Sequence, residues 1–118
     1  MARYTYMFLL NPKAGREKEW DEWHRTHHVP DVLDIPGFVS CRRFRAASAQ
    51  RDNSVPQWQN MALYEVETDD PVSVFAEIKR RVGTGQIVMS DTADPSRAVA
   101  VLWEPISEHA GGQARRAR

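Results

Sequence analysis

The chain has 118 residues, 42% hydrophobic and 27% charged, which is the composition of one globular domain. Its 16 Lys and Arg balance 16 Asp and Glu, so it lacks the basic field that holds nucleic acid. The longest apolar run, Tyr6 to Leu10, is too short to cross a bilayer, and the polar start does not resemble a signal peptide. We therefore expect a cytoplasmic protein with neither nucleic acid nor membrane as a partner.

The only cysteine, Cys41, cannot form an internal disulfide or a thiolate metal cage. Stability must therefore come from a core or from a partner subunit. Four Trp, four Phe and three Tyr are a generous aromatic supply for a core of this size. Because a core of this size has room for only part of these aromatic residues, we expect some of them to pack against a partner subunit.

The first part of the chain predicts a strand followed by a helix. Residues 3–11 carry apolar side chains on both faces, as in a strand buried on both sides, and a turn follows. From Arg16 the apolar spacing becomes helical. Pro30 is expected to end or kink this helix near His28, because proline lacks the amide donor. A short second turn follows and stops at Pro36-Gly37.

The second part predicts three more strands and one more helix. The predicted elements are a strand over 38–46, a polar loop over 47–57, a strand over 58–66, a helix from Thr68-Asp69-Asp70-Pro71 to Gly83, a weak helix or loop over 84–96, and a strand over 98–105. In the strand over 38–46, strict alternation puts Phe38, Ser40, Arg42 and Phe44 opposite Val39, Cys41, Arg43 and Arg45.

This order of elements is the split βαβ arrangement of ferredoxin-like α+β domains. One antiparallel sheet would carry both helices on one face and leave its other apolar face bare. Pairing two sheets would cover that face, so we expect a homodimer that forms an α+β barrel. Residues 1–107 are assigned to this single domain and residues 108–118 to a disordered tail.

Three of the four histidines fall within five residues of the predicted first helix. His24 and His28 stand four residues apart, so they occupy neighbouring positions on the helix, and His27 lies beside them. Imidazole titrates near neutrality and can accept or deliver a proton without a cofactor. Asp31 is close enough in sequence to orient an imidazole. These four residues are the candidate acid/base group.

Two other interpretations of this cluster stay open. The histidines can be packing residues beside Trp20 and Trp23, with His28 interacting with the last carbonyls of the helix. His24, His28 and Asp31 could also ligate a metal, although the His-Glu-x-x-His pattern of zinc proteases is absent. We expect no metal.

Polar residues on the strands are candidate substrate contacts. An arginine aimed into an apolar pocket can clamp a carboxylate with two hydrogen bonds, and alternation along the strand directs Arg43 or Arg42 inward. Both can instead lie along a strand edge or in interfacial salt bridges. Asn11 ends the first strand, where its side chain can reach a ligand, although Asn-Pro also opens turns. No phosphate-binding glycine loop or dinucleotide fingerprint is present, so we expect no cofactor.

The histidine segment resembles the EthD-like family of dimeric α+β-barrel proteins. The residues that carry the resemblance are Trp23, His28, Pro30, Asp31 and Pro36-Gly37. The resemblance is strongest over residues 8–44, and the remainder of the chain resembles the family only in the order of its strands and helices. The resemblance implies a small pocket between the helices and the sheet, with His28 as the residue that carries over. It also implies relatives that act without metal or organic cofactor as isomerases, cyclases, decarboxylases or oxygenases on aromatic, ring-opened or polyketide-type compounds.

Two branches of that superfamily bear on the reaction. The haem-degrading branch places its haem-ligating histidine on the second helix, and residues 71–83 contain none. The oxygenase branch uses Asn, Trp and Tyr around an electron-rich quinol, and Asn11 with Tyr6 could supply part of that arrangement. The fold alone does not choose between reactions.

The hypothesis that we carry forward is a cofactor-independent isomerase, with a lyase as a related reaction class. The substrate would be a small acidic aromatic-derived or ring-opened dienoate or enol. His28, helped by His24 or His27, would move the proton, and Arg43 or Arg42 would hold a carboxylate. The alternatives are a cofactor-free monooxygenase, cyclase or decarboxylase, a non-catalytic ligand-binding dimer, and a subunit that scaffolds a larger enzyme.

Overall fold

The computed structural model describes residues 1–112, so the last part of the predicted tail, residues 113–118, lies outside the described residues. The elements are β1 (Arg3–Pro12), α1 (Glu17–Trp23), the π-helical turn η1 (His24–His28), α2 (Val29–Leu33), β2 (Phe38–Arg45), the short 3₁₀ turn η2 (Arg51–Asn53), β3 (Asn60–Glu67), α3 (Pro71–Thr84) and β4 (Ala93–Trp103). No helix within residues 1–112 is long and apolar enough to span a membrane.

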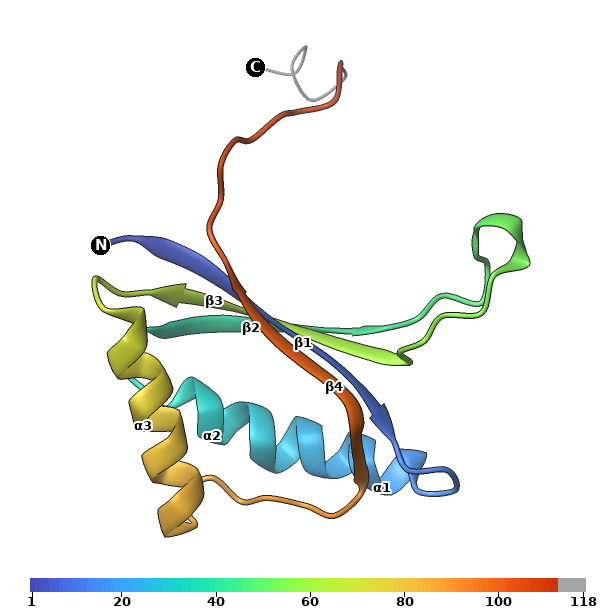
Figure 1. Ribbon diagram of the computed structural model, residues 1–118, viewed down its shortest axis with the longest axis horizontal. Helices are drawn as coiled ribbons and strands as arrows, with labels where there is room; N and C mark the ends of the chain where they lie inside the picture. Colours follow the sequence, from blue (N-terminus) through green and yellow to red (C-terminus); the bar gives the residue numbers. More distant parts are fainter. Residues whose placement is uncertain (113–118) are drawn as a thin grey trace.

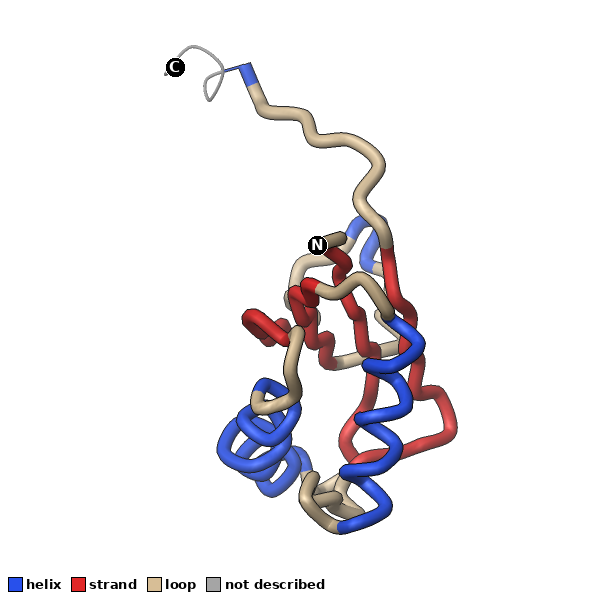
Figure 2. The backbone as a smooth tube through the Cα atoms, turned by 90° about the vertical axis from the view of Figure 1, so that its left-hand side faces the viewer, coloured by secondary structure: helices blue, strands red, loops and turns tan. Residues whose placement is uncertain are grey.

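The four strands form one antiparallel sheet in the order β2-β3-β1-β4. Both helical segments cover the same face of this sheet, as Figures 1 and 2 show. This arrangement confirms the predicted ferredoxin-like α+β fold. β4 begins earlier than the sequence predicts, because Asp94 and Ala93 pair with Asn11 and Pro12 beyond an irregularity in the register.

The helix does not end at Pro30. The disturbance that the sequence predicts near His28 is a change of hydrogen-bond register in η1, after which the chain continues as the short α2. In η1 each hydrogen bond joins residues five apart, as in a π-helix, and the backbone N–H of Val29 donates to the carbonyl of His24. A new α-helical register begins at this point, and Pro30 occupies its first turn. Amides of a first turn lack α-helical partners anyway, so the missing N–H of proline does not break the helix there.

The second long helix begins as predicted but ends later. The Asp70 side chain accepts a hydrogen bond from the backbone N–H of Ser73, and Pro71 occupies the first turn. Gly83 lies inside the helix. The end comes at Gly85, whose φ of 79° provides the left-handed cap that glycine adopts without strain.

The core lies between the helices and the sheet. Its buried members are Val32, Ile35, Phe38, Ala62, Tyr64, Val66, Val74 and Ile87. The ring of Tyr64 lies edge-on to Phe8 and Phe38, with centroids 5.6 and 5.5 Å away. Phe75 of α3 packs edge-on against Tyr6 of β1 at 5.5 Å, so large aromatic side chains join α3 to the sheet.

An irregularity in β2 decides which of its side chains face the helices. Phe38 pairs with Val66, but Cys41 already pairs with Tyr64, so one extra residue is accommodated between Phe38 and Ser40. A bulge of this kind reverses the alternation that follows it. Arg43 consequently shares the helix-covered face with Phe38, whereas the sequence analysis placed these two residues on opposite faces.

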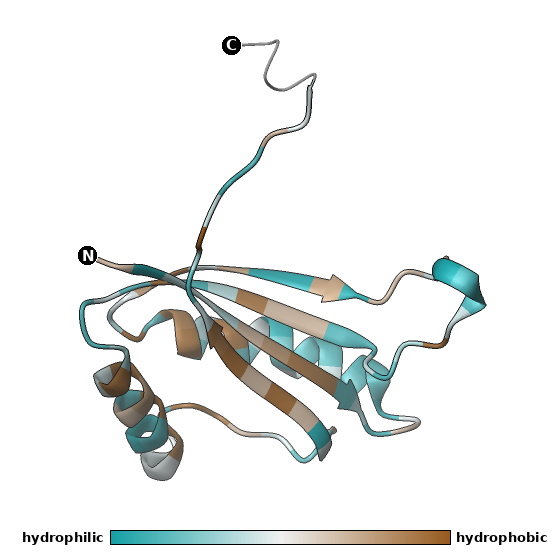
Figure 3. Cartoon of the chain, turned by 45° about the horizontal axis from the view of Figure 1, so that its top comes forward, coloured by the Kyte–Doolittle hydropathy of each residue, from teal (hydrophilic) through white to brown (hydrophobic). Residues whose placement is uncertain are grey.

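The described chain places no helix over the other face of the sheet. Apolar residues from all four strands alternate onto this open face: Met7, Leu9, Phe44, Met61, Leu63, Val99, Val101 and Trp103. Figure 3 shows long hydrophobic stretches along the strands. An uncovered apolar surface of this extent is typical of an interaction site.

Candidate functional site

His24 lies in a chain of three polar residues between the first helix and β2. Its side chain is 4% exposed, and its ring stacks on Trp20 with centroids 4.7 Å apart. Arg43 Nε donates a hydrogen bond to His24 Nδ1 over 3.0 Å, and Arg43 Nη2 donates to Asp21 Oδ1. The bulge in β2 makes this chain possible, because it turns Arg43 toward the helix.

The contact with Arg43 fixes the proton on the other nitrogen of His24. A guanidinium has only donors, so His24 Nδ1 must be unprotonated to accept from it, and Nε2 carries the hydrogen. Burial, together with the neighbouring His28 ring and the Arg43 guanidinium, lowers the pKa of His24 to about 3. His24 is therefore a neutral donor through Nε2 near neutral pH.

His28 is the second imidazole of the cluster, and one of its ring nitrogens lacks a hydrogen-bond partner in the described residues. Its Nδ1 is buried and has no hydrogen-bond partner among residues 1–112. The ring lies between Trp23 and His24, with centroid distances of 4.8 and 5.4 Å. Burial lowers the pKa of His28, and the carboxylate of Asp31 partly offsets this. A neutral imidazole with a free nitrogen is what a general base requires.

Asp31 is held by a backbone group from elsewhere in the chain. Its Oδ2 accepts a hydrogen bond from the backbone N–H of Val88 over 3.0 Å. Trp23 Nε1 donates to the carbonyl of the same Val88, also over 3.0 Å. Asp31 thus acts on His28 through its charge, while its hydrogen bond goes to the segment between α3 and β4.

The remaining predicted residues are spread over three regions. His27 is exposed on the helix. Tyr6 lies inside the layer between sheet and helices, with its ring 4.5 Å from Phe8, and burial raises its pKa. Arg42 lies on the open face of the sheet, with its guanidinium 4.9 Å from the centre of the Phe44 ring.

Asn11 fastens the loop between β2 and β3 to the end of β1. Its Nδ2 donates to the carbonyl of Gln57 over 2.9 Å, and its Oδ1 accepts from the backbone N–H of Gln59 over 2.7 Å. Both ends of the side-chain amide are therefore engaged with backbone. The structure thus brings together His24, His28, Asp31 and Arg43, and it separates them from His27, Asn11 and Arg42.

The sequence analysis missed two residues beside this group. Asp21 stands one turn before His24, a spacing that could have revealed it. Tyr64 pairs with Cys41 in the sheet, and its buried hydroxyl lies beside the Cys41 thiol. Burial raises the pKa of Tyr64, so the phenol stays protonated. Only the strand pairing brings Tyr64 near Arg43.

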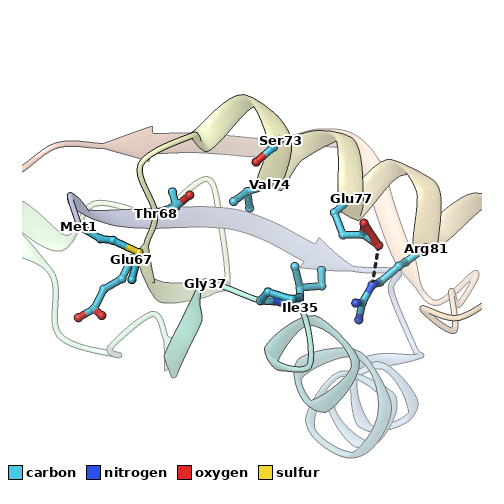
Figure 4. A pocket seen from close by; sticks show the side chains of 10 residues that line it. Met1, Ile35, Gly37, Glu67, Thr68, Ser73, Val74, Glu77 and Arg81 are labelled. Carbon is cyan, nitrogen blue, oxygen red and sulfur yellow. Dashed lines mark hydrogen bonds and ion pairs between the residues drawn. The ribbon is translucent and has the colours of Figure 1, made fainter.

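A cavity of about 530 Å³ lies between α3 and the turn after α2. It is lined by Met1, Ile35, Pro36, Gly37, Glu67, Thr68, Ser73, Val74, Glu77 and Arg81. Figure 4 shows Val74 and Ile35 on opposite sides of it and the ion pair of Glu77 with Arg81 at one end. Arg81 also pairs with Asp34. No predicted site residue lines this cavity, and its one arginine already has two carboxylate partners.

The donors present do not favour a metal or haem centre. Within residues 1–112 no three His, Cys, Asp or Glu side chains are grouped so that they could hold a metal ion. The alternative trio of His24, His28 and Asp31 is divided, because His24 Nδ1 accepts from Arg43 and Asp31 accepts from Val88. α3 contains no histidine that could ligate haem.

Comparison with known proteins identifies the fold. No protein-family model matches the chain, and no curated protein sequence matches it. An ethyl tert-butyl ether D (EthD) family protein from Bacillus halodurans superimposes with a TM-score of 0.60 at 14% identity, over 90% of this chain and 100% of that one. A dimeric ferredoxin-like protein of unknown function from Thermobifida fusca gives 0.61 at 10% identity, over 88% and 92%.

A third similar structure is an enzyme. The heme-degrader MhuD from Mycobacterium tuberculosis, solved with two hemes in its active site, gives a TM-score of 0.60 at 14% identity, over 91% of this chain and 99% of that one. At such low identity these structures share the fold and not a reaction. The chain has the ferredoxin-like α+β fold, and its resemblance to the EthD family is confirmed at the level of that fold.

Proposed function

We propose that the protein is a cofactor-independent isomerase that shifts a proton on a small carboxylic acid with conjugated double bonds. The observation that carries this proposal is the buried, unpartnered Nδ1 of a neutral His28 between two aromatic rings. A desolvated neutral imidazole can take a proton from carbon and return it without any further group.

Each neighbour of His28 has a role in this proposal. His28 removes a proton from a carbon next to the conjugated system, the electron pair of the broken C–H bond delocalises as a dienolate, and the imidazolium returns the proton at another carbon. Arg43 uses Nε and Nη2 for His24 and Asp21, which leaves Nη1 for a substrate carboxylate. Its charge, with the Nε2–H of His24, stabilises the dienolate.

The proposal includes a homodimer that buries the open face of the sheet. Apolar side chains from four strands, Met7 and Leu63 among them, occupy this face, and a second copy offers a surface of matching chemistry. The similar protein from Thermobifida fusca is described as dimeric. The cytoplasmic location expected from composition is also kept as part of the proposal.

The experiment is a deuterium-exchange screen. The protein is incubated in D₂O with a panel of ring-opened dienoic and enolic acids, and NMR follows both isomerisation and deuterium uptake at carbon. We expect His28→Ala to reduce the rate by about 10² to 10⁴, whereas the exposed His27→Ala leaves it unchanged. A rate that survives His28→Ala, or a panel in which no acid exchanges or isomerises, contradicts the proposal.

The alternative functions give different results in the same preparation. A monooxygenase would consume oxygen with an electron-rich quinol, but Asn11, one of the residues for that alternative, is occupied by the loop backbone. A non-catalytic binder would retain a ligand without converting it. A scaffolding subunit would copurify with a larger enzyme.

A further inference from the structure

The segment between α3 and β4 is hydrogen-bonded to the middle of the histidine-bearing helix through Val88, and its Asp91 pairs with Arg16 at the start of that helix. Both polar groups of the Val88 peptide backbone are used: its N–H donates to Asp31 Oδ2, and its carbonyl accepts from Trp23 Nε1. The preceding residue, Ile87, is 1% exposed and belongs to the core cluster. Figure 1 shows this segment, residues 85–92, running beside α1 and α2 on its way to β4.

The two side chains that hold Val88 lie on either side of His28 in the helix. Trp23 stands five residues before His28 and contacts its ring at 4.8 Å. Asp31 stands three residues after His28, and its charge acts on the imidazole. Because both side chains reach the same Val88, the segment lies against the part of the helix that carries His28. The buried Nδ1 of His28 lies in this part of the helix.

We propose that Asp31 and Trp23 are positioning residues that hold residues 85–92 as a lid over His28. The proposal rests on the role of His28 given above and adds how substrate reaches it. The two hydrogen bonds lie where solvent can compete for them, so the lid opens around Val88 at a modest cost while the buried Ile87 and Thr92 keep its two ends attached. Closure excludes water from the imidazole and keeps it neutral.

The test measures access to His28 directly and needs no substrate. Asp31→Ala and Trp23→Phe each remove one of the two bonds, and Trp23→Phe retains an aromatic ring beside His28. Asp31→Asn is the conservative variant, because its amide oxygen still accepts from Val88 N–H. Asp34→Ala is the matched control, since Asp34 is an exposed carboxylate of the same helix end that pairs with Arg81 instead of the lid.

Two readouts are combined for each folded variant. The first is the rate of His28 modification by diethyl pyrocarbonate, read by peptide fragmentation relative to the exposed His27 in the same molecule. The second is amide hydrogen exchange of residues 86–90. We expect Asp31→Ala and Trp23→Phe to raise both rates about threefold to tenfold, and Asp31→Asn and Asp34→Ala to leave both near the wild-type values.

Unchanged His28 reactivity in folded Asp31→Ala and Trp23→Phe would overturn the lid, as would an equal increase in Asp34→Ala. If Asp31→Ala does not fold, Trp23→Phe with Asp31→Asn decides the question. Neither readout depends on turnover, so a protein without isomerase activity can still show the lid. Conversely, an active enzyme with unchanged reactivity refutes the lid alone.

Discussion

Burial of His24 makes the stability of this protein depend on pH, and His24→Gln tests that dependence. The glutamine amide oxygen can still accept from Arg43 Nε, so the polar chain to Asp21 is preserved while the titratable imidazole is removed. The folded state holds the pKa of His24 at about 3, against 6.5 for the free side chain. The unfolded state therefore binds this proton first as the pH falls.

The sign and size of the effect follow from these two pKa values. A lowered folded pKa contributes full stability above pH 6.5, and that contribution is lost as the pH falls toward 3. The loss amounts to about 1.4 kcal/mol per pH unit for one proton, and to about 3 kcal/mol between about pH 7 and about pH 4. His28 makes stability depend on pH in the same direction, because burial lowers its pKa as well. His28 is present in both wild type and His24→Gln, so the difference between them reports on His24.

The assay is urea unfolding of wild type and His24→Gln at several pH values. Protein concentration is held constant, because the apparent stability of a dimer depends on it. We expect the free energy of unfolding of wild type to fall more steeply with acidification, by up to about 1.4 kcal/mol per pH unit between pH 6 and pH 4. Parallel curves would refute the reasoning. So would ¹⁵N NMR that shows His24 titrating near 6.5 or carrying its hydrogen on Nδ1.

Three further substitutions test other parts of the structure. Gly37→Ala should lower the free energy of unfolding in urea by about 1 to 3 kcal/mol, because Gly37 has φ of 99° and an added Cβ would lie 3.1 Å from the carbonyl oxygen of Glu67. Gly83→Ala is the control: the added Cβ meets open space in α3 and should raise the free energy of unfolding by about 0.5 to 1 kcal/mol. Leu63→Glu on the open face should shift sedimentation to the monomer, while Val55→Glu on the exposed loop should leave the dimer intact; a dimer that survives Leu63→Glu contradicts the proposed interface. Asn11→Ala should speed proteolysis of the loop over residues 46–59 several-fold, because two hydrogen bonds to that loop are lost, and unaltered cleavage would argue against this role.

The element order was predictable because alternation and helical spacing are local. The strand over β1 and the cap at Asp70 with Pro71 follow directly from the identity of neighbouring residues. The bulge after Phe38 was not predictable in this way, since it depends on how β2 pairs with β3. Its one extra residue reverses the faces of Arg42 and Arg43 and so decides which arginine meets His24.

The candidate site was predictable where its residues share the first helix, and Arg43 only as one of two candidate arginines on β2. His24 and His28 are neighbours in the helix, and their spacing indicated the cluster. The partner of Asp31 was not predictable, because Val88 lies 57 residues away and contributes only backbone groups that no side-chain pattern reveals. The continuation of the helical chain past Pro30 likewise depends on the π-helical hydrogen bonds of η1, which were not predicted from the sequence.

The most direct test of the central claim is a crystal structure of the protein soaked with a ring-opened, conjugated dicarboxylic acid. The proposal predicts that the acid lies beside His28, with its reacting carbon about 3 to 3.5 Å from the imidazole and a carboxylate on Arg43 Nη1. An acid bound instead in the cavity between α3 and the turn after α2, with His28 still covered, would contradict the claim that His28 carries the chemistry.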